Sequence, residues 1–223
     1  MKGLFITFEG SEGCGKSTQV KLLVERLTKL GHIVRLTREP GGTPIGEEIR
    51  HTLKHSQDNA AMTWEAELLL MNASRAQLVR EFIRPALARG EIIVSDRFYD
   101  STTAYQGYGR QLDLAAVQSI IRFAVGETRP DLTLLVAVPA EVSAERLRSR
   151  QATLPFVRDR IEESDRAFFD RVANGYEAIA RAEPERVQRV DGVGTLESVH
   201  AAIWQLVAGK LAGRQPPSAA LLR

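Results

Sequence analysis

The sequence predicts an α/β fold, a five-stranded parallel sheet with helices on both faces. Two observations predict it. Short apolar runs alternate with longer stretches of helical periodicity along the whole 223-residue chain, and glycine-rich polar sequence follows the first apolar run directly. Because ligands bind such sheets at the carboxyl ends of the strands, we expect the functional residues just after each strand.

Five apolar runs are the expected strands. They are Leu4–Phe8, Ile33–Thr37, Ile92–Ser95, Leu132–Val138 and the weaker Val187–Val190. Stretches of helical periodicity between them are the expected helices, namely Thr18–Leu30, Glu65–Ala88, Leu114–Gly126, Ala140–Arg150, Glu162–Arg181 and Leu196–Leu211. In the first helix Val20, Leu23 and Leu27 recur on one face, which is typical of a helix packed against a sheet.

The composition excludes several classes of protein. Hydrophobic residues make up 43% and charged residues 26% of the chain, which excludes a mainly disordered protein. The net charge of +2 gives no sign of a nucleic-acid partner or a membrane surface. The single cysteine, Cys14, excludes an intramolecular disulfide and a cysteine-rich zinc site.

The same features set expectations for location and domain organisation. No apolar run reaches the length of a membrane span, and the first apolar run is too short for a secretion signal, so we expect a cytoplasmic protein. We expect a single domain over residues 1–212. Residues 213–223, which contain Pro and Ser, are the expected flexible C-terminal tail.

A phosphate-binding loop follows the first expected strand. Residues 10–17 (GSEGCGKS) match G-x-x-x-x-G-K-[ST] in full and open the first expected helix. The glycines let successive backbone N–H groups point at one anion, and the helix N-terminus adds positive charge there. Lys16 would reach the β- and γ-phosphates, and the Ser17 hydroxyl would bind Mg²⁺. The expected ATP-binding residues here are Gly10, Ser11, Glu12, Gly13, Cys14, Gly15, Lys16, Ser17 and Thr18.

Asp96 and Arg97 follow the third expected strand. A carboxylate at this position can hold the water shell of a metal ion, so Asp96 joins Ser17 as an expected metal residue. The neighbouring Arg97 can bind phosphoryl oxygens with two parallel hydrogen bonds. A surface Asp-Arg pair that merely ends a strand is the alternative.

Further motifs resemble the bacterial thymidylate kinases. They are T-R-E-P-G-G-T at 37–43, A-S-R at 73–75, D-R-F at 96–98, D-S-T-T-A-Y-Q-G at 100–107 and R-P-D-L-T at 129–133. The resemblance covers Met1 to about Leu206. It implies the fold of the P-loop nucleoside monophosphate kinases, the reaction ATP + dTMP → ADP + dTDP with Mg²⁺, and a homodimer.

Three arginines indicate that the acceptor carries a phosphate. Arg38 follows the second expected strand, Arg97 follows the third, and Arg75 lies in an otherwise apolar helix. If the three converge at the edge of the sheet, they repel one another unless an anion lies among them. A monophosphate acceptor would need such a cluster, whereas a nucleoside would not.

The resemblance assigns roles to these arginines. It implies that Arg38, Arg50 and Arg97 bind the region of the acceptor phosphate. It also implies that Arg75 hydrogen-bonds the thymine base, for which a planar guanidinium is suited. For Arg50 the alternative is an ion pair on a helix surface, which contributes little stability.

Other acceptor residues also follow from the resemblance. Residues that would recognise the base and exclude a ribose 2′-hydroxyl are Thr102, Tyr105 and Gln106. Glu9 would lie near the sugar 3′-hydroxyl and the metal. Met71 stands where the family usually has a phenylalanine that stacks on thymine. Either Met71 itself or an aromatic residue such as Phe98 would cover the base.

An arginine-rich stretch between two expected helices is the expected lid. It runs from Arg146 to Arg160 and contains five arginines. Because the phosphate loop has no arginine, the resemblance implies that the lid supplies one to the reaction. The unranked candidates, which join Lys16 and Arg97 as expected catalytic residues, are Arg150, Arg158 and Arg160. Arg146 would pack on adenine. The alternative is a solvated helix end paired with nearby carboxylates.

Two other functions compete with a thymidylate kinase. One is another small-acceptor kinase of the same architecture, which the combination of T-R-E-P-G-G with A-Y-Q-G disfavours. The other is a nucleotide-dependent switch. Switches that bind GTP carry an Asn-Lys-x-Asp motif, and this sequence has none.

Overall fold

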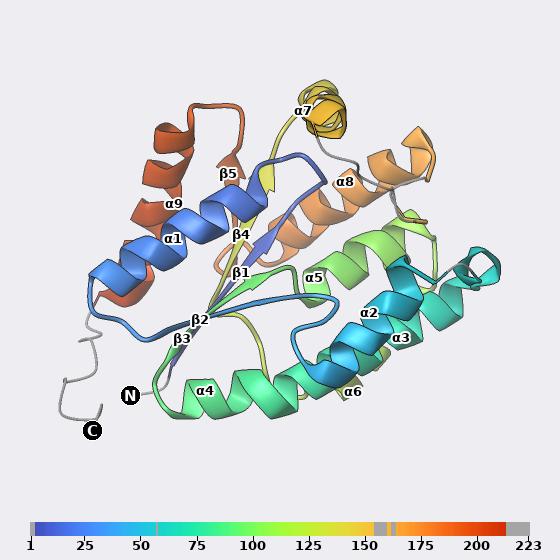
Figure 1. Cartoon of the computed structure of the whole chain (residues 1–223), viewed down its shortest axis with the longest axis horizontal. Helices are drawn as coiled ribbons and strands as arrows, with labels where there is room; N and C mark the ends of the chain where they lie inside the picture. The colour runs from blue at the N-terminus through green and yellow to red at the C-terminus, as the bar shows by residue number, and fades with distance from the viewer. Residues whose placement is uncertain (1–2, 57, 154–159, 162–163, 213–223) are drawn as a thin grey trace.

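Five parallel strands form one sheet in the order β2-β3-β1-β4-β5, which confirms the predicted sheet (Figure 1). The computed structural model describes residues 3–56, 58–153, 160–161 and 164–212. The strands are β1 (Leu4–Glu9), β2 (Val34–Arg38), β3 (Ile92–Asp96), β4 (Leu132–Ala137) and β5 (Val187–Asp191). The connection from β3 to β4 crosses β1, so the strand order reverses beside β1, where ligands bind in sheets of this kind.

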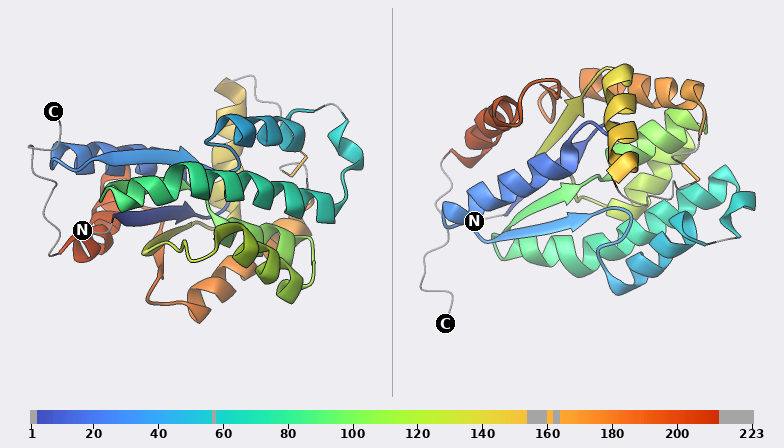
Figure 2. Two further views of the ribbon diagram at one scale, coloured as in Figure 1. Left: turned by 90° about the horizontal axis from the view of Figure 1, so that it is seen from below. Right: turned by 45° about the horizontal axis from the view of Figure 1, so that its top comes forward.

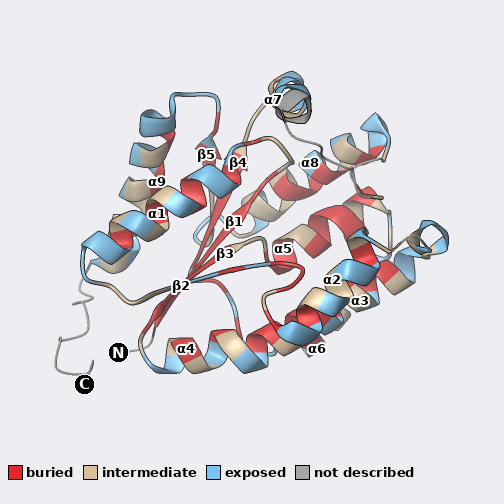
Figure 3. Cartoon of the chain, viewed as in Figure 1, coloured by how far each residue is buried: buried red, intermediate tan, exposed pale blue. Residues whose placement is uncertain are grey.

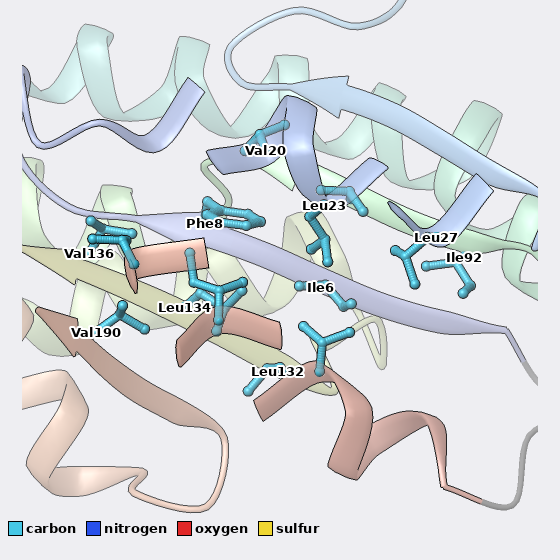
Figure 4. Packing of buried hydrophobic residues seen from close by; sticks show 14 of the residues in the cluster. Ile6, Phe8, Val20, Leu23, Leu27, Ile92, Leu132, Leu134, Val136 and Val190 are labelled. Carbon is cyan, nitrogen blue, oxygen red and sulfur yellow. The ribbon is translucent and has the colours of Figure 1, made fainter. Parts of the chain in front are cut away.

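Helices cover both faces of the sheet (Figure 2). On one face Ile6 and Phe8 of β1 pack against α1 (Lys16–Lys29) and α9 (Leu196–Leu211), with Leu23 of α1 fully buried (Figure 4). Phe5 of the same strand packs into the core on the opposite face. This alternation with a period of two is that of a strand buried on both sides.

The opposite layer is built from four helices. These are α3 (Trp64–Leu78), α4 (Arg84–Ala88), α6 (Leu114–Val125) and α8 (Arg166–Ala182). Buried residues of these helices face the strands, and exposed residues lie on their outer sides (Figure 3). Two further helices are the short η1 (Asn59–Ala61) and α7 (Ala140–Thr153), which follows β4.

The helix expected over 65–88 contains a wider turn, η2 (Val79–Ile83), between α3 and α4. Pro85 follows this turn in the sequence. A proline inside a helix has no N–H to donate and its ring crowds the carbonyl four residues earlier, here that of Glu81. A wider π-turn accommodates this crowding without breaking the helix.

Two helical segments lie outside the elements expected from the sequence. One is α2 (Pro44–Lys54), whose cap residue Thr43 accepts a hydrogen bond from the Gly46 N–H at 3.0 Å. The other is the continuous run of α5 (Tyr99–Thr102) and η3 (Thr103–Gly109). The glycines of this segment interrupt the helical pattern of the sequence. Gly109 is nevertheless required, because a Cβ there would lie 2.6 Å from the Phe168 ring.

Helix α8 begins later in the chain than expected. It begins at Arg166 rather than at Glu162, because the Asp165 carboxylate caps it by accepting from the Phe168 N–H at 2.7 Å.

Within the described residues, no helix has the length and apolar character needed to cross a bilayer.

Candidate active site

The phosphate-binding loop connects β1 to α1. Gly10 and Gly15 have φ angles of 135° and 96°, which favour glycine. A Cβ on Gly10 would also lie 2.3 Å from the Val136 carbonyl oxygen, so only glycine fits there. The Lys16 ammonium is buried and donates to the carbonyls of Gly10 and Ser11 at 2.8 and 2.9 Å. The lysine charge therefore lies at the centre of the loop.

Ser17 and Asp96 meet at the end of the sheet. The Ser17 hydroxyl donates to the Asp96 carboxylate at 3.0 Å. A hydroxyl and a carboxylate oxygen are hard ligands of the kind that Mg²⁺ prefers, and Mg²⁺ takes its other ligands from water and phosphates. The two residues therefore suit a magnesium nucleotide. No cluster of three or more metal-ligating side chains occurs among the residues that the structure describes.

A cavity of about 460 Å³ lies over the loop and is called the phosphate-side cavity here. Six cationic side chains and three carboxylates line it, which leaves it positive. The cations are Lys16, Arg38, Arg50, Lys54, Arg97 and Arg146, and the loop residues Glu12, Gly13, Cys14, Gly15, Ser17 and Thr18 also line it. Its volume lies within the usual range of small-molecule sites.

Arg146 and Arg50 are each held by backbone carbonyls in this cavity. Arg146 donates to the carbonyls of Gly192 and Cys14 at 3.0 and 3.4 Å, so it bridges the loop after β5 and the phosphate-binding loop. Arg50 donates to the Pro40 carbonyl at 2.9 Å. Arg50 lines the same cavity as Arg38 and Arg97, and its contact with the acceptor phosphate stays a prediction.

A second cavity adjoins the first and is called the acceptor cavity here. It is lined by Glu12, Glu39, Pro40, Lys54, Met71, Arg75, Arg97, Phe98, Ser101, Thr102, Tyr105, Gln106, Ile161 and Phe169. It therefore contains Met71 together with Phe98 and Phe169, the aromatic residues that could cover a base beside Met71. The two cavities share four residues, which are Glu12, Glu39, Lys54 and Arg97. Its volume is only about 60 Å³.

Arg97 lies at the junction of the two cavities. Its φ of 74° is unusual for a residue other than glycine, and such a backbone costs ~1–2 kcal/mol. Its side chain donates to Glu12 at 2.5 Å and to the hydroxyls of Ser101 and Tyr176, each at 3.1 Å. These partners hold the guanidinium where it faces both cavities.

The three predicted arginines line the two cavities, and each of them pairs with a carboxylate. Arg38 lines the phosphate-side cavity, Arg75 the acceptor cavity, and Arg97 both. The anions that such a cluster needs are protein carboxylates here, because Glu47, Glu39 and Glu12 pair with Arg38, Arg75 and Arg97. Protein carboxylates neutralise the cluster.

Arg75 is almost fully buried in the wall of the acceptor cavity. Its guanidinium donates to the Glu39 carboxylate at 2.8 Å and to the Asn72 side-chain oxygen at 2.9 Å. Burial raises the pKa of Glu39, although the charge of Arg75 opposes this shift. These partners fix the plane of the guanidinium, as recognition of a flat base requires.

Burial and charge have opposite outcomes at two nearby carboxyl groups. Burial and the charge of Asp100 raise the pKa of Glu9 to about 7, although Arg97 opposes them. Burial would also raise the pKa of Glu12, but Arg97, Lys16 and Lys54 outweigh it and lower that pKa to about 2. Glu12 is therefore a permanent anion at neutral pH, whereas Glu9 titrates there.

Glu9 is fully buried behind the acceptor cavity rather than in its lining. Its carboxylate accepts hydrogen bonds from the Phe98 N–H at 2.8 Å, from the Ser101 hydroxyl at 2.5 Å and from the Tyr176 hydroxyl at 2.8 Å. Glu9 thus organises the groups that contact Arg97. The direct contact with the sugar 3′-hydroxyl stays a prediction.

Thr102, Tyr105 and Gln106 line the acceptor cavity on one side of the α5–η3 segment. The Tyr105 hydroxyl accepts from Arg97 at 3.3 Å, and Gln106 donates to the buried Glu67 carboxylate at 2.7 Å. These residues lie on the helical segment formed by α5 and η3.

The lid arginines are described only in part. Arg158 lies outside the described residues, and for Arg150 only the backbone is described. Arg160 pairs with Glu67 and lies over the Trp64 ring. Arg160 is therefore held by these two residues and lines neither cavity.

The roles of several site residues were not predicted from the sequence. Tyr176 contributes its hydroxyl from α8, far along the chain, and no motif marks it. Glu39 and Ser101 lie inside motifs that the sequence analysis quoted, so their motif positions were the available signal for a role in the site. Glu12 was expected only as a loop residue, and its pairing with Arg97 depends on the tertiary fold.

Comparisons with known proteins agree with this geometry. The family model described as thymidylate kinase matches residues 8–203. The thymidylate kinase of Syntrophotalea carbinolica is 48% identical over 208 residues, which cover 93% of this chain and 96% of that protein. That of a Synechococcus strain is 44% identical over 217 residues, covering 96% and 100%.

A solved structure gives the same result at the level of the fold. The crystal structure of thymidylate kinase from Ehrlichia chaffeensis superimposes with a TM-score of 0.73 at 31% identity, covering 93% of this chain and 99% of that one. With the phosphate-binding loop, the two adjoining cavities and the family match all in place, the chain belongs to the thymidylate kinase family.

Proposed function

We propose that this protein transfers the γ-phosphoryl group of ATP to the 5′-phosphate of dTMP and releases ADP and dTDP. The observation that supports this most strongly is the pair of adjoining cationic cavities that share Arg97. One phosphate oxygen of dTMP forms the new bond to the γ-phosphorus as the bond from that phosphorus to the β-bridging oxygen breaks. A phosphate oxygen is already a nucleophile, so no strong general base is needed.

Charge neutralisation is the main task of the protein in this reaction. Lys16 would exchange its loop carbonyls for β- and γ-phosphate oxygens, and Arg146 would pack on adenine. Arg97 would contact both the acceptor phosphate and the transferred group. Mg²⁺, held by Ser17 and Asp96 through its ligands and water shell, would neutralise phosphate charge when bound. Residues 146–160 are proposed as the lid, with Arg150 and Arg158 as catalytic candidates.

Binding of dTMP requires a rearrangement at the junction. The acceptor cavity of about 60 Å³ is far smaller than the usual nucleotide site. The Arg97 guanidinium is also already paired with the Glu12 carboxylate. We propose that the dTMP phosphate replaces Glu12 as the partner of Arg97, with Arg38 and Arg50 completing the phosphate site. Arg75 would bind thymine, which Met71 and Phe98 would cover. Tyr105 would exclude a ribose 2′-hydroxyl.

The protein is also proposed to act as a homodimer. Phe123 of α6 is 85% exposed and Leu69 of α3 is 56% exposed, and these two helices pack against each other. Large exposed apolar side chains on neighbouring helices are typical of an interface between copies. A twofold axis would bury both helices against their equivalents.

The substrate assignment is tested by ADP release in a coupled assay with dTMP, dUMP, UMP, dCMP and thymidine. We expect dTMP to give the highest kcat/KM and thymidine to give no turnover. Lys16→Ala should lower kcat at least about a hundredfold, whereas the exposed Lys21→Ala on the same helix should leave it unchanged. A preference for another acceptor would overturn the substrate assignment.

Arg75→Lys tests the thymine contact. Lysine keeps the charge that Glu39 needs but removes the planar fork, so the KM for dTMP should rise about 10–100-fold while the KM for ATP stays within twofold. Arg35→Lys is the matched control, because Arg35 also pairs with a buried glutamate, Glu91, outside both cavities. Equal changes in both KM values would place Arg75 outside the acceptor site.

Glu9→Gln tests the raised pKa. The folded protein favours protonated Glu9, so this group's contribution to the free energy of unfolding is complete below pH 4.5 and is lost as the pH rises to about 7. The loss is about 3 kcal/mol. The Tm of Glu9→Gln minus the Tm of the wild type should therefore increase by several degrees from pH 4.5 to pH 8, because the wild type alone loses this contribution. A Tm difference that stays the same between pH 4.5 and pH 8 would contradict the assignment.

Phe123→Glu tests the proposed dimer. A charge at the centre of an apolar interface opposes association, so sedimentation velocity should give a dimer for the wild type and a monomer for the variant. Leu196→Glu, at an exposed leucine of α9 on the other face of the sheet, should remain dimeric. A monomeric wild type would remove this proposal.

A further inference from the structure

The α5–η3 segment separates two cavities. Ser101, Thr102 and Tyr105 line the acceptor cavity. Tyr99, Asp100 and Thr103, on the opposite side of the same segment, line a different cavity of about 530 Å³ between α6 and α8, called the back cavity here. The first turn of the segment is therefore a thin wall between two open spaces. Tyr99 of this turn packs in the apolar core, whereas Asp100 and Thr103 face the back cavity with polar side chains.

The second half of the segment is fixed by close packing instead. A Cβ on Gly109 would lie 2.6 Å from the Phe168 ring, and a Cβ on Gly175 would lie 2.8 Å from the Tyr108 ring. Helix α8 and η3 thus meet at contact distance. This leaves the first turn, which carries Ser101 and Thr102, to be positioned by other interactions.

Asp100 provides such an interaction on the back of the wall. Both of its carboxylate oxygens accept from the guanidinium of Arg186, at 2.6 and 2.9 Å. The Thr133 hydroxyl of β4 donates to the same carboxylate at 3.1 Å. Asp100 and Arg186 are 3% and 10% exposed, so the pair is bidentate and shielded from water. Such pairs are strong and directional.

The pair is anchored to rigid parts of the fold. Arg186 directly precedes β5, and its backbone carbonyl accepts from the Thr133 N–H at 2.8 Å. Its guanidinium also donates to Glu183 at the end of α8, at 2.8 Å, and Glu183 in turn binds Arg129 at 2.9 Å. Asp100 is thereby tied to two strands and a helix end at once.

On the front of the wall, Ser101 is tied to Glu9 at the end of β1. Asp100 and Ser101 are adjacent, so Glu9 and Arg186 hold the same turn from opposite sides. Loss of the Arg186 contact would release this turn toward the back cavity and move Ser101 and Thr102 out of register with Arg97. A displacement of this kind affects the acceptor cavity and leaves the phosphate-binding loop unchanged.

We propose that Asp100, clamped by Arg186, is a positioning residue for dTMP, because it sets the wall of the acceptor cavity from the face that the substrate never touches. This inference rests on the proposed function, in which the acceptor cavity holds dTMP. Asp100 itself contacts neither substrate. Its effect is specific to the acceptor because the segment it holds lines the acceptor cavity and contributes no residue to the phosphate-side cavity.

The test is Asp100→Asn in the full chain, with steady-state KM values for dTMP and ATP and the Tm of each protein. The amide is isosteric but loses the charge and one acceptor of the bidentate pair. We expect the KM for dTMP to rise about tenfold, equivalent to ~1.4 kcal/mol, and the KM for ATP to stay within twofold. Titration calorimetry of dTMP should show the same loss of affinity.

Glu91→Gln is the matched control. Glu91 is a buried carboxylate that pairs with Arg35 and Arg89, and it precedes β3 at the end of the sheet opposite the site. Its substitution should lower the Tm as Asp100→Asn does, but both KM values should stay within twofold. A purely structural role for Asp100 would make the two variants behave alike, which would overturn the proposal.

Arg186→Lys provides the second variant, which keeps a cation beside Asp100 and removes the bidentate fork. It should raise the KM for dTMP less than Asp100→Asn does, with the KM for ATP unchanged. If neither Arg186→Lys nor a folded Asp100→Asn changes the KM for dTMP, the proposal is wrong. A wild-type enzyme that does not phosphorylate dTMP would refute the proposed function instead, so the two failures are distinguishable.

Discussion

The site depends on one guanidinium, that of Arg97, being held between two cavities. Phosphoryl transfer brings two polyanions together, and their mutual repulsion is relieved only by a cation that both can contact. A residue that directly follows β3, the neighbour of the central strand β1, is placed for this, because the sheet reverses its order beside β1. The left-handed backbone of Arg97 is the conformational cost of turning the side chain toward the junction.

The carboxylates around the arginines are as much part of the site as the arginines. Without a ligand, Arg38, Arg75 and Arg97 would destabilise the fold by repulsion and desolvation. Glu47, Glu39 and Glu12 remove that problem by pairing with them. An anionic ligand therefore exchanges one negative partner for another instead of entering a bare positive pocket, and the gain in affinity is the difference between the two.

The sequence was sufficient for the sheet, the phosphate-binding loop and the arginines, because each has a local signature. Apolar runs marked the strands to within one or two residues, and the loop motif placed Lys16 and Ser17. It was insufficient for the α5–η3 segment, since Gly107 and Gly109 resemble a loop until Leu114 and Phe168 are seen against them. Pairings such as Glu12 with Arg97, or Tyr176 with Glu9, link residues too distant in sequence for periodicity to indicate.

Burial divides the ion pairs of the site into two classes with different uses. The side chains of Glu12 and Glu47 are 30% and 42% exposed, so each can leave its arginine for water when a phosphate arrives. Glu39 and Asp100 are 4% and 3% exposed, and neither can leave without stranding a buried charge. In the proposed function, the exchangeable pairs surround the phosphate of dTMP. The permanent pairs fix Arg75 and the wall of the acceptor cavity, where shape and hydrogen-bond geometry would distinguish one base from another. On this proposal, affinity for charge and selectivity for thymine rest on separate sets of carboxylates, so that the first set changes with each turnover while the second stays constant.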